Sequence, residues 1–144
     1  MSSATKRLIK ELGQIHHDGS LDPLVTLSPV SDEDLFTWKA LLNGPPDTPY
    51  EGGVFELLIS IPDSYPIQPP SLKFLTTVCH PNVKFDSGEI CLDILKDQWS
   101  PAWTIKSTCL AISLLLSNPE PSSPLNCDVA NLLRCGDRIG YDSL

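Results

Sequence analysis

The first part of the chain carries apolar residues at the spacing of one helix face. Within residues 3–17, apolar positions recur at intervals of four and three. These positions are Leu8, Leu12 and Ile15. The pattern predicts an amphipathic helix, with Ser2 or Ser3 as its N-cap.

Strand-like segments follow the helix. The third of them has apolar residues on both faces, as expected of a strand covered on both sides. Short, turn-rich connections join successive segments, which favours an antiparallel meander. The four expected strands are residues 24–28, 35–42, 54–61 and 72–75.

The pattern changes after the third strand. Residues 62–103 are rich in proline and poor in periodicity, which predicts a long ordered loop of the kind that forms an active-site wall. A second helix is expected at about 105–116, capped by Thr104, and a short third one at about 128–133. The prediction is an α+β fold in a single domain, residues 1–144: an N-terminal helix, a four-stranded antiparallel sheet, a long active-site loop and C-terminal helices, the last one short.

Charge and composition exclude several classes of protein. The net charge of −8 argues against a nucleic-acid binder, because such a surface repels phosphate. No apolar stretch reaches the roughly 20 residues of a membrane span, and the first seven residues lack the apolar core of a secretory signal. We therefore expect a protein that faces the cytosol. Lys6, Arg7 and Lys10 form either a solvated helix face or a docking patch for an acidic partner.

The five cysteines do not suggest a metal site. They show no CxxC spacing and no obvious set of four ligands, so we expect neither zinc nor another metal. Free cysteine is commonly buried, and Cys109 falls on the apolar face of the second predicted helix. Most of the cysteines are therefore expected to be small core residues.

Cys91 is the exception among the cysteines. It follows Asn82 by nine positions, so a thiol and a side-chain amide donor lie close together in the chain. Acyl transfer through a thioester requires this pair of groups. Asn82 either stabilises the tetrahedral intermediate or orders its own loop, and Asp93 either orients an incoming amine or is a solvated loop carboxylate.

Six segments follow one another in an order that is typical of one enzyme family: residues 44–55, Tyr65-Pro66, Pro69-Pro70, His80-Pro81-Asn82, 88–95 and 99–102. Together they resemble the catalytic domain of the ubiquitin-conjugating enzymes, over nearly the whole chain. The resemblance implies that Cys91 accepts the C-terminal carboxylate of ubiquitin from an activating enzyme, as a thioester, and passes it to an amine or a thiol. ATP is then used upstream by the activating enzyme, and no cofactor is expected. In this family the histidine of the fourth segment, His80 here, looks structural.

The resemblance also implies surfaces for partners. The basic residues of the first helix match the face that meets the activating enzyme: Lys6, Arg7 and Lys10. Two loops match those that a RING-type ligase grips, and their residues are Ile67, Ser100, Pro101 and Ala102. An exposed Ile beside Pro-Ala would make a small apolar anchor.

Departures from the family point to a narrower group. Ser123 stands where many members have an acidic gate residue, so a hydroxyl replaces a carboxylate that could help a lysine lose its proton. Residues 123–137 resemble the peroxisomal ubiquitin-conjugating enzymes of yeasts. That branch is held at the cytosolic face of the peroxisome by a membrane-anchored partner, and modifies import receptors on lysine or cysteine.

Three other functions are compatible with parts of the sequence. One is a conjugating enzyme for another ubiquitin-like modifier, since specificity lies in contacts with the activating enzyme. A non-catalytic ubiquitin-binding variant would lack the nucleophile, which Cys91 argues against. A cysteine hydrolase would need an essential histidine, such as His16 or His17.

Overall fold

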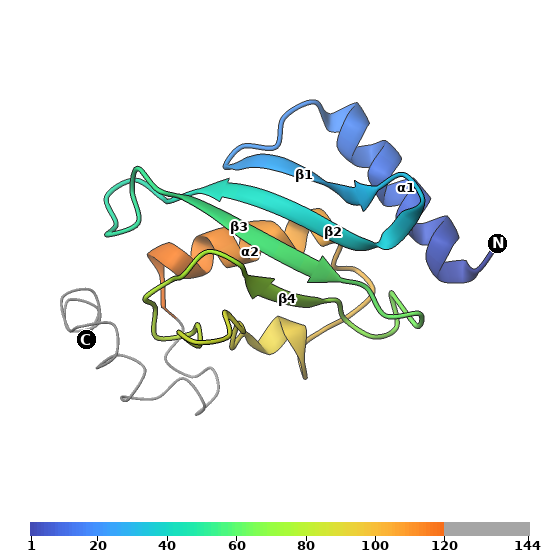
Figure 1. The fold of residues 1–144 in the computed structure, drawn as a ribbon. Coiled ribbons are helices and arrows are strands. Elements are labelled where there is room, and N and C mark those ends of the chain that lie inside the picture. Colours follow the sequence, from blue (N-terminus) through green and yellow to red (C-terminus); the bar gives the residue numbers. More distant parts are fainter. Residues whose placement is uncertain (120–144) are drawn as a thin grey trace.

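The computed structural model describes residues 1–119, which form a helix, a four-stranded sheet and a second helix (Figure 1). The second helix runs across one face of the sheet, and the first helix lies at the side of the sheet where the N-terminus is. The elements are α1 (Ser3–Asp18), β1 (Leu24–Ser31), β2 (Asp34–Asn43), β3 (Val54–Ser60), β4 (Ser71–Phe74), the 3₁₀ helix η1 (Asp93–Leu95) and α2 (Ile105–Ser117). This arrangement confirms the predicted α+β fold. The short helix expected at 128–133 lies outside the described residues.

Helix α1 begins where its capping chemistry predicts. The side chain of Ser2 accepts a hydrogen bond from the backbone N–H of Thr5, which satisfies one of the N–H groups that a helix leaves unpaired at its start. The predicted apolar stripe faces inward, with Leu8 and Ile15 buried. The opposite face carries exposed lysines. The helix is therefore held by burial of one side and leaves the other available to partners.

The sheet has the order β1-β2-β3-β4, and every neighbouring pair is antiparallel. Residues of neighbouring strands that face each other on the inner side are fully buried: Trp38 pairs with Ile59, and Ala40 pairs with Leu57. This register puts the large apolar side chains in one core with the buried residues of α2. The register is therefore strongly specified, since a shift of one residue would turn these side chains outward.

Helix α2 starts at a capping box. The side chain of Thr104 accepts from the backbone N–H of Ser107, and the side chain of Ser107 accepts from the backbone N–H of Thr104. The inner face buries Cys109, whose thiol is completely covered. Burial raises the pKa of this thiol to about 12. Cys109 is therefore a core residue, as the sequence predicts.

The segment between β3 and α2 is an ordered loop region, as expected, with two short exceptions. Strand β4 interrupts it, close to the predicted position. The single turn η1 was not foreseen, because three residues carry no periodic signal. The turn η1 begins two positions after Cys91.

Candidate active site

A tight hairpin brings Asn82 and Cys91 together. The backbone N–H of Cys91 donates to the carbonyl oxygen of Asn82 at 2.7 Å, and Val83 and Ile90 form an antiparallel bridge next to it. The hairpin closes through a bond from the N–H of Lys84 to the carbonyl oxygen of Glu89, at 2.9 Å. The nine positions that separate the two residues in sequence are therefore folded back on themselves. The thiol and the amide belong to neighbouring positions in space.

Gly88 anchors this hairpin to the sheet. Its carbonyl oxygen accepts from the N–H of Phe74, the last residue of β4, at 2.9 Å. Its φ of +76° lies in the left-handed region, and a Cβ added to it would lie 2.0 Å from the carbonyl oxygen of Phe74. Only glycine fits both the conformation and the close approach. The position of Cys91 is thus fixed by the rigid sheet.

His80 holds the other side of the hairpin. The N–H of Asn82 donates to Nδ1 of His80 at 2.9 Å, which puts the imidazole proton on Nε2, where it is donated to the carbonyl oxygen of Leu115 at 2.7 Å. Burial lowers the pKa of His80 to about 4, against the opposing effect of the bond to Leu115. A neutral imidazole with a hydrogen bond at each ring nitrogen orders the loop and connects it to α2.

Cys91 and Asn82 are buried, with 2% and 3% of each residue's surface exposed. A low-dielectric site strengthens any hydrogen bond that the amide donates to a developing negative charge. The structure has Cys91 in its disulfide-bonded form, and only the reduced thiolate can attack a thioester. Asp93 opens η1 with an exposed side chain, and its backbone carbonyl accepts from the N–H groups of Lys96 and Gln98. Asp93 is therefore an exposed residue two positions after the buried Cys91.

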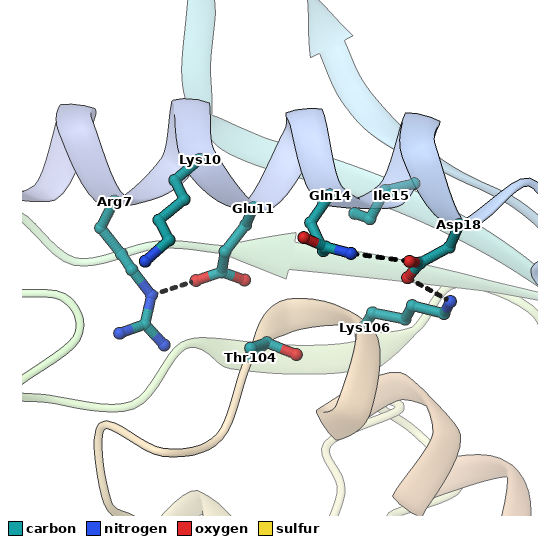
Figure 2. A pocket seen from close by; sticks show the side chains of 8 residues that line it. All are labelled: Arg7, Lys10, Glu11, Gln14, Ile15, Asp18, Thr104 and Lys106. Carbon is teal, nitrogen blue, oxygen red and sulfur yellow. Dashed lines mark hydrogen bonds and ion pairs between the residues drawn. The ribbon is translucent and has the colours of Figure 1, made fainter.

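The three basic residues of α1 do not share one environment. Lys6 and Lys10 are exposed, while Arg7 is half-buried and turned inward. Its Nε donates to Oε2 of Glu11 at 2.7 Å (Figure 2). Arg7, Lys10 and Glu11 also line a cavity of about 240 Å³ between α1 and the start of α2. The basic face therefore consists of two solvent-facing lysines, beside an arginine engaged in internal contacts.

The two loops expected to meet a ligase are exposed and lie next to each other. Ile67 is 73% exposed, a large value for an isoleucine, and Ser100, Pro101 and Ala102 are exposed as well. The indole N–H of Trp99 donates to the carbonyl oxygen of Pro66 at 2.9 Å, which joins the loops at their bases. The exposed apolar side chains of Ile67, Pro101 and Ala102 thus lie on two loops that a hydrogen bond holds together.

Sequence reasoning missed Glu11. Its position four residues after Arg7 was a signal for an ion pair on one helix face, although such pairs usually lie in solvent. The gate residue predicted from the sequence, Ser123, lies outside the described residues. Within residues 1–119, no helix is long and apolar enough to cross a membrane, and no group of three metal-binding side chains comes together.

Comparisons with known proteins identify the family of the chain. The family model described as "Ubiquitin-conjugating enzyme" matches residues 7–143. Protein PEROXIN-4 of Arabidopsis thaliana is 53% identical, covering 100% of this chain and 91% of the relative, and Ubiquitin-conjugating enzyme E2 16 of Schizosaccharomyces pombe is 52% identical, covering 100% and 89%. A crystal structure of the H. polymorpha ubiquitin conjugating enzyme Pex4p, in complex with the soluble domain of Pex22p, is similar with a TM-score of 0.82 and 40% identity, over 97% of this chain and 92% of that one. The chain belongs to the family of the ubiquitin-conjugating enzymes.

Proposed function

We propose that Cys91 is the residue that carries ubiquitin, within a single catalytic domain of residues 1–144. The thiolate of Cys91 attacks the carbonyl carbon of the thioester between ubiquitin and the activating enzyme. A new S–C bond forms, the old one breaks, and the thiolate of the activating enzyme leaves. The observation that carries this proposal is the hairpin, since it holds a thiol and an amide donor at one rigid end of the sheet.

Asn82 is proposed to donate its side-chain amide N–H to the oxyanion formed during transfer. A second role, ordering the loop, is compatible with the first, because backbone groups of Asn82 already bond to Cys91 and His80. These two bonds do not use its side chain. Asp93 is proposed to orient the incoming amine, for which its exposed carboxylate at the rim of the site is suitable.

The acceptor is proposed to be a lysine or a cysteine of a peroxisomal import receptor. Ser123 supplies no carboxylate at the gate position, so a lysine acceptor would find no general base there to take its proton. A thiol acceptor needs less help, because its pKa is nearer to neutral. The names of the relatives, among them Protein PEROXIN-4, support the peroxisomal role.

Three partners follow from this role. Lys6, Arg7 and Lys10 are proposed to meet the activating enzyme, and the Ile67 and Ser100–Ala102 loops a RING-type ligase. A membrane-anchored partner is proposed to hold the protein at the cytosolic face of the peroxisome. The support for such a partner is the relative Pex4p, whose structure contains a soluble domain of Pex22p.

A discharge experiment tests the proposal. The reduced protein is charged with ubiquitin by activating enzyme and ATP, the supply is stopped, and free lysine or free cysteine is added at equal concentration. We expect rapid loss of the thioester with cysteine, slow loss with lysine, and faster loss with lysine in Ser123→Asp. Failure to form any thioester would refute the carrier function, whereas equal lysine rates in wild type and Ser123→Asp would refute only the role of the gate.

A further inference from the structure

Helix α1 and the two loops proposed to bind a ligase meet at one buried carboxylate, that of Glu11. The side chain of Glu11 is 6% exposed, although glutamate is rarely buried unless it is paired. The same stretch of α1 also presents Lys6 and Lys10 to solvent. This stretch of α1 therefore belongs both to the surface proposed for the activating enzyme and to the support of the loops proposed for the ligase.

Both oxygens of the Glu11 carboxylate are engaged. Oε2 accepts from Nε of Arg7 at 2.7 Å and from the hydroxyl of Tyr65, while Oε1 accepts from the backbone N–H of Ile105 at 2.8 Å. These donors come from α1, from the loop after β3 and from the first residue of α2. A single group thus connects three segments that are far apart in sequence.

Tyr65 extends this connection to the Ile67 loop. Its ring lies 6.1 Å from that of Trp99, whose indole N–H donates to the carbonyl oxygen of Pro66. Burial, followed by the bond to Glu11, raises the pKa of the Tyr65 hydroxyl, so this group stays protonated and acts as a donor. The base of the Ile67 loop therefore depends on an acceptor in α1.

Arg7 extends the connection to the second loop. Its Nη2 donates to the carbonyl oxygens of Pro101 and Trp103, both at 2.8 Å, and its guanidinium lies 5.5 Å from the centre of the Tyr65 ring. Glu11 supplies the negative charge beside this half-buried cation. Without the carboxylate, the guanidinium of Arg7 and the hydroxyl of Tyr65 would lose their shared acceptor. The two loops would then lose their common support.

We propose that Glu11 is a positioning residue that fixes the Ile67 loop and the Ser100–Ala102 loop relative to each other, and so sets the affinity for the ligase. This inference rests on the proposed function, which assigns those loops to ligase binding. Glu11 acts through Arg7 and Tyr65 and need not touch the ligase. The affinity for the ligase is thereby made dependent on a residue of α1.

The test compares Glu11→Gln with Asp18→Asn. Glutamine has the size of glutamate but replaces one acceptor oxygen with a donor and removes the charge. Asp18 also joins α1 to the start of α2, through a 3.1 Å ion pair with Lys106, and it bonds to neither loop. The control therefore removes a charge from the same helix and loosens the same pair of helices. Figure 2 shows both carboxylates on α1.

Two readouts are recorded for each variant. One is the ¹H–¹⁵N spectrum, followed at the Trp99 indole N–H and at the amides of Ile67, Ser100 and Ala102. The other is the Kd for a RING domain that binds the wild-type protein in the same titration. For Glu11→Gln we expect loop resonances that shift or broaden and a Kd raised about tenfold, which corresponds to about 1.4 kcal/mol. For Asp18→Asn we expect wild-type loop resonances and Kd.

The remaining outcomes are decisive. A wild-type Kd in Glu11→Gln would overturn the proposal, whether or not its resonances move. An equal rise of Kd in Asp18→Asn would also overturn it, because the effect would then be a general loosening. If Glu11→Gln does not fold, Tyr65→Phe, which removes one donor to Glu11, must raise the Kd and move the Trp99 resonance, and the absence of both changes would overturn the proposal. Charging of the wild type by activating enzyme is measured in parallel, and its failure would refute the proposed function instead.

Discussion

The carbonyl oxygen of Asn82 accepts the backbone N–H of Cys91 at 2.7 Å, so main-chain atoms hold these two residues beside each other. This bond uses neither side chain. This separation makes the chemistry of the site accessible to mutation, because the loss of a functional group need not mean the loss of the hairpin.

Asn82→Ala tests the amide donor. If the side chain stabilises the oxyanion, discharge of ubiquitin to an amine should slow by roughly 10²–10³-fold, the usual cost of removing one such donor. The measurement is the rate of thioester loss in the presence of free lysine. Wild-type discharge in this variant would show that Asn82 only orders the loop.

Gly88→Ala tests the support of the hairpin. The variant forces a Cβ against the carbonyl oxygen of Phe74 at a φ of +76°, and we expect it to lower the free energy of unfolding by about 2 kcal/mol or more. The matched control is Gly52→Ala, at a φ of +87° with open space around it, which should cost about 1 kcal/mol. Urea denaturation measures both. Equal losses would mean that the close approach to Phe74 does not matter.

The buried imidazole of His80 should make stability depend on pH. In the folded protein the pKa of His80 is lowered to about 4, below the ordinary 6.5. As the pH falls, the histidine of the unfolded chain therefore binds its proton before that of the folded protein does. The stabilisation is fully present above about pH 6.5 and is lost as the pH falls towards 4, with a total of up to about 3 kcal/mol.

The double variant His16→Gln/His17→Gln isolates this effect, because the chain has three histidines. An NMR titration of the one that remains should give a pKa near 4, and unfolding free energies should fall in the same interval. A pKa of His80 near 6.5 would contradict a buried imidazole with hydrogen bonds at both ring nitrogens.

Lys6 and Lys10 should govern charging by the activating enzyme. The double variant Lys6→Ala/Lys10→Ala is expected to lower the rate of thioester formation roughly tenfold at low salt and to reduce its dependence on salt, because exposed cations accelerate encounter with an acidic partner. The control is Lys39→Ala/Lys73→Ala, which removes the same charge from exposed positions of the sheet. Equal effects in the two variants would rule out a specific basic face on α1.

Local chemistry made the helices and the strand order predictable. Ser2 and Thr104 have cap-forming side chains immediately before helical apolar patterns, and both act as N-caps. The strands are joined by short, turn-rich connections, which are a short-range signal as well. The thiol of Cys91 and the amide of Asn82 could be proposed from their spacing and from the resemblance of the surrounding segments to a known family.

Long-range contacts were the part that the sequence did not reveal. Arg7 looks like a surface cation in an exposed helical turn, but its guanidinium bonds to Pro101 and Trp103, more than 90 positions away. The importance of Glu11 depends on the same contacts. The reason why Gly88 must be glycine is its approach to Phe74, which only the folded hairpin creates.

The central claim is that Cys91 carries ubiquitin, and one measurement tests it most directly. The reduced protein, Cys91→Ala and the control Cys109→Ala are incubated with ubiquitin, activating enzyme and ATP, then separated on gels with and without reductant. We predict one reducible adduct of one ubiquitin in the wild type and in Cys109→Ala, and none in Cys91→Ala. A reducible adduct that persists in Cys91→Ala, or no adduct in the wild type, would contradict the account.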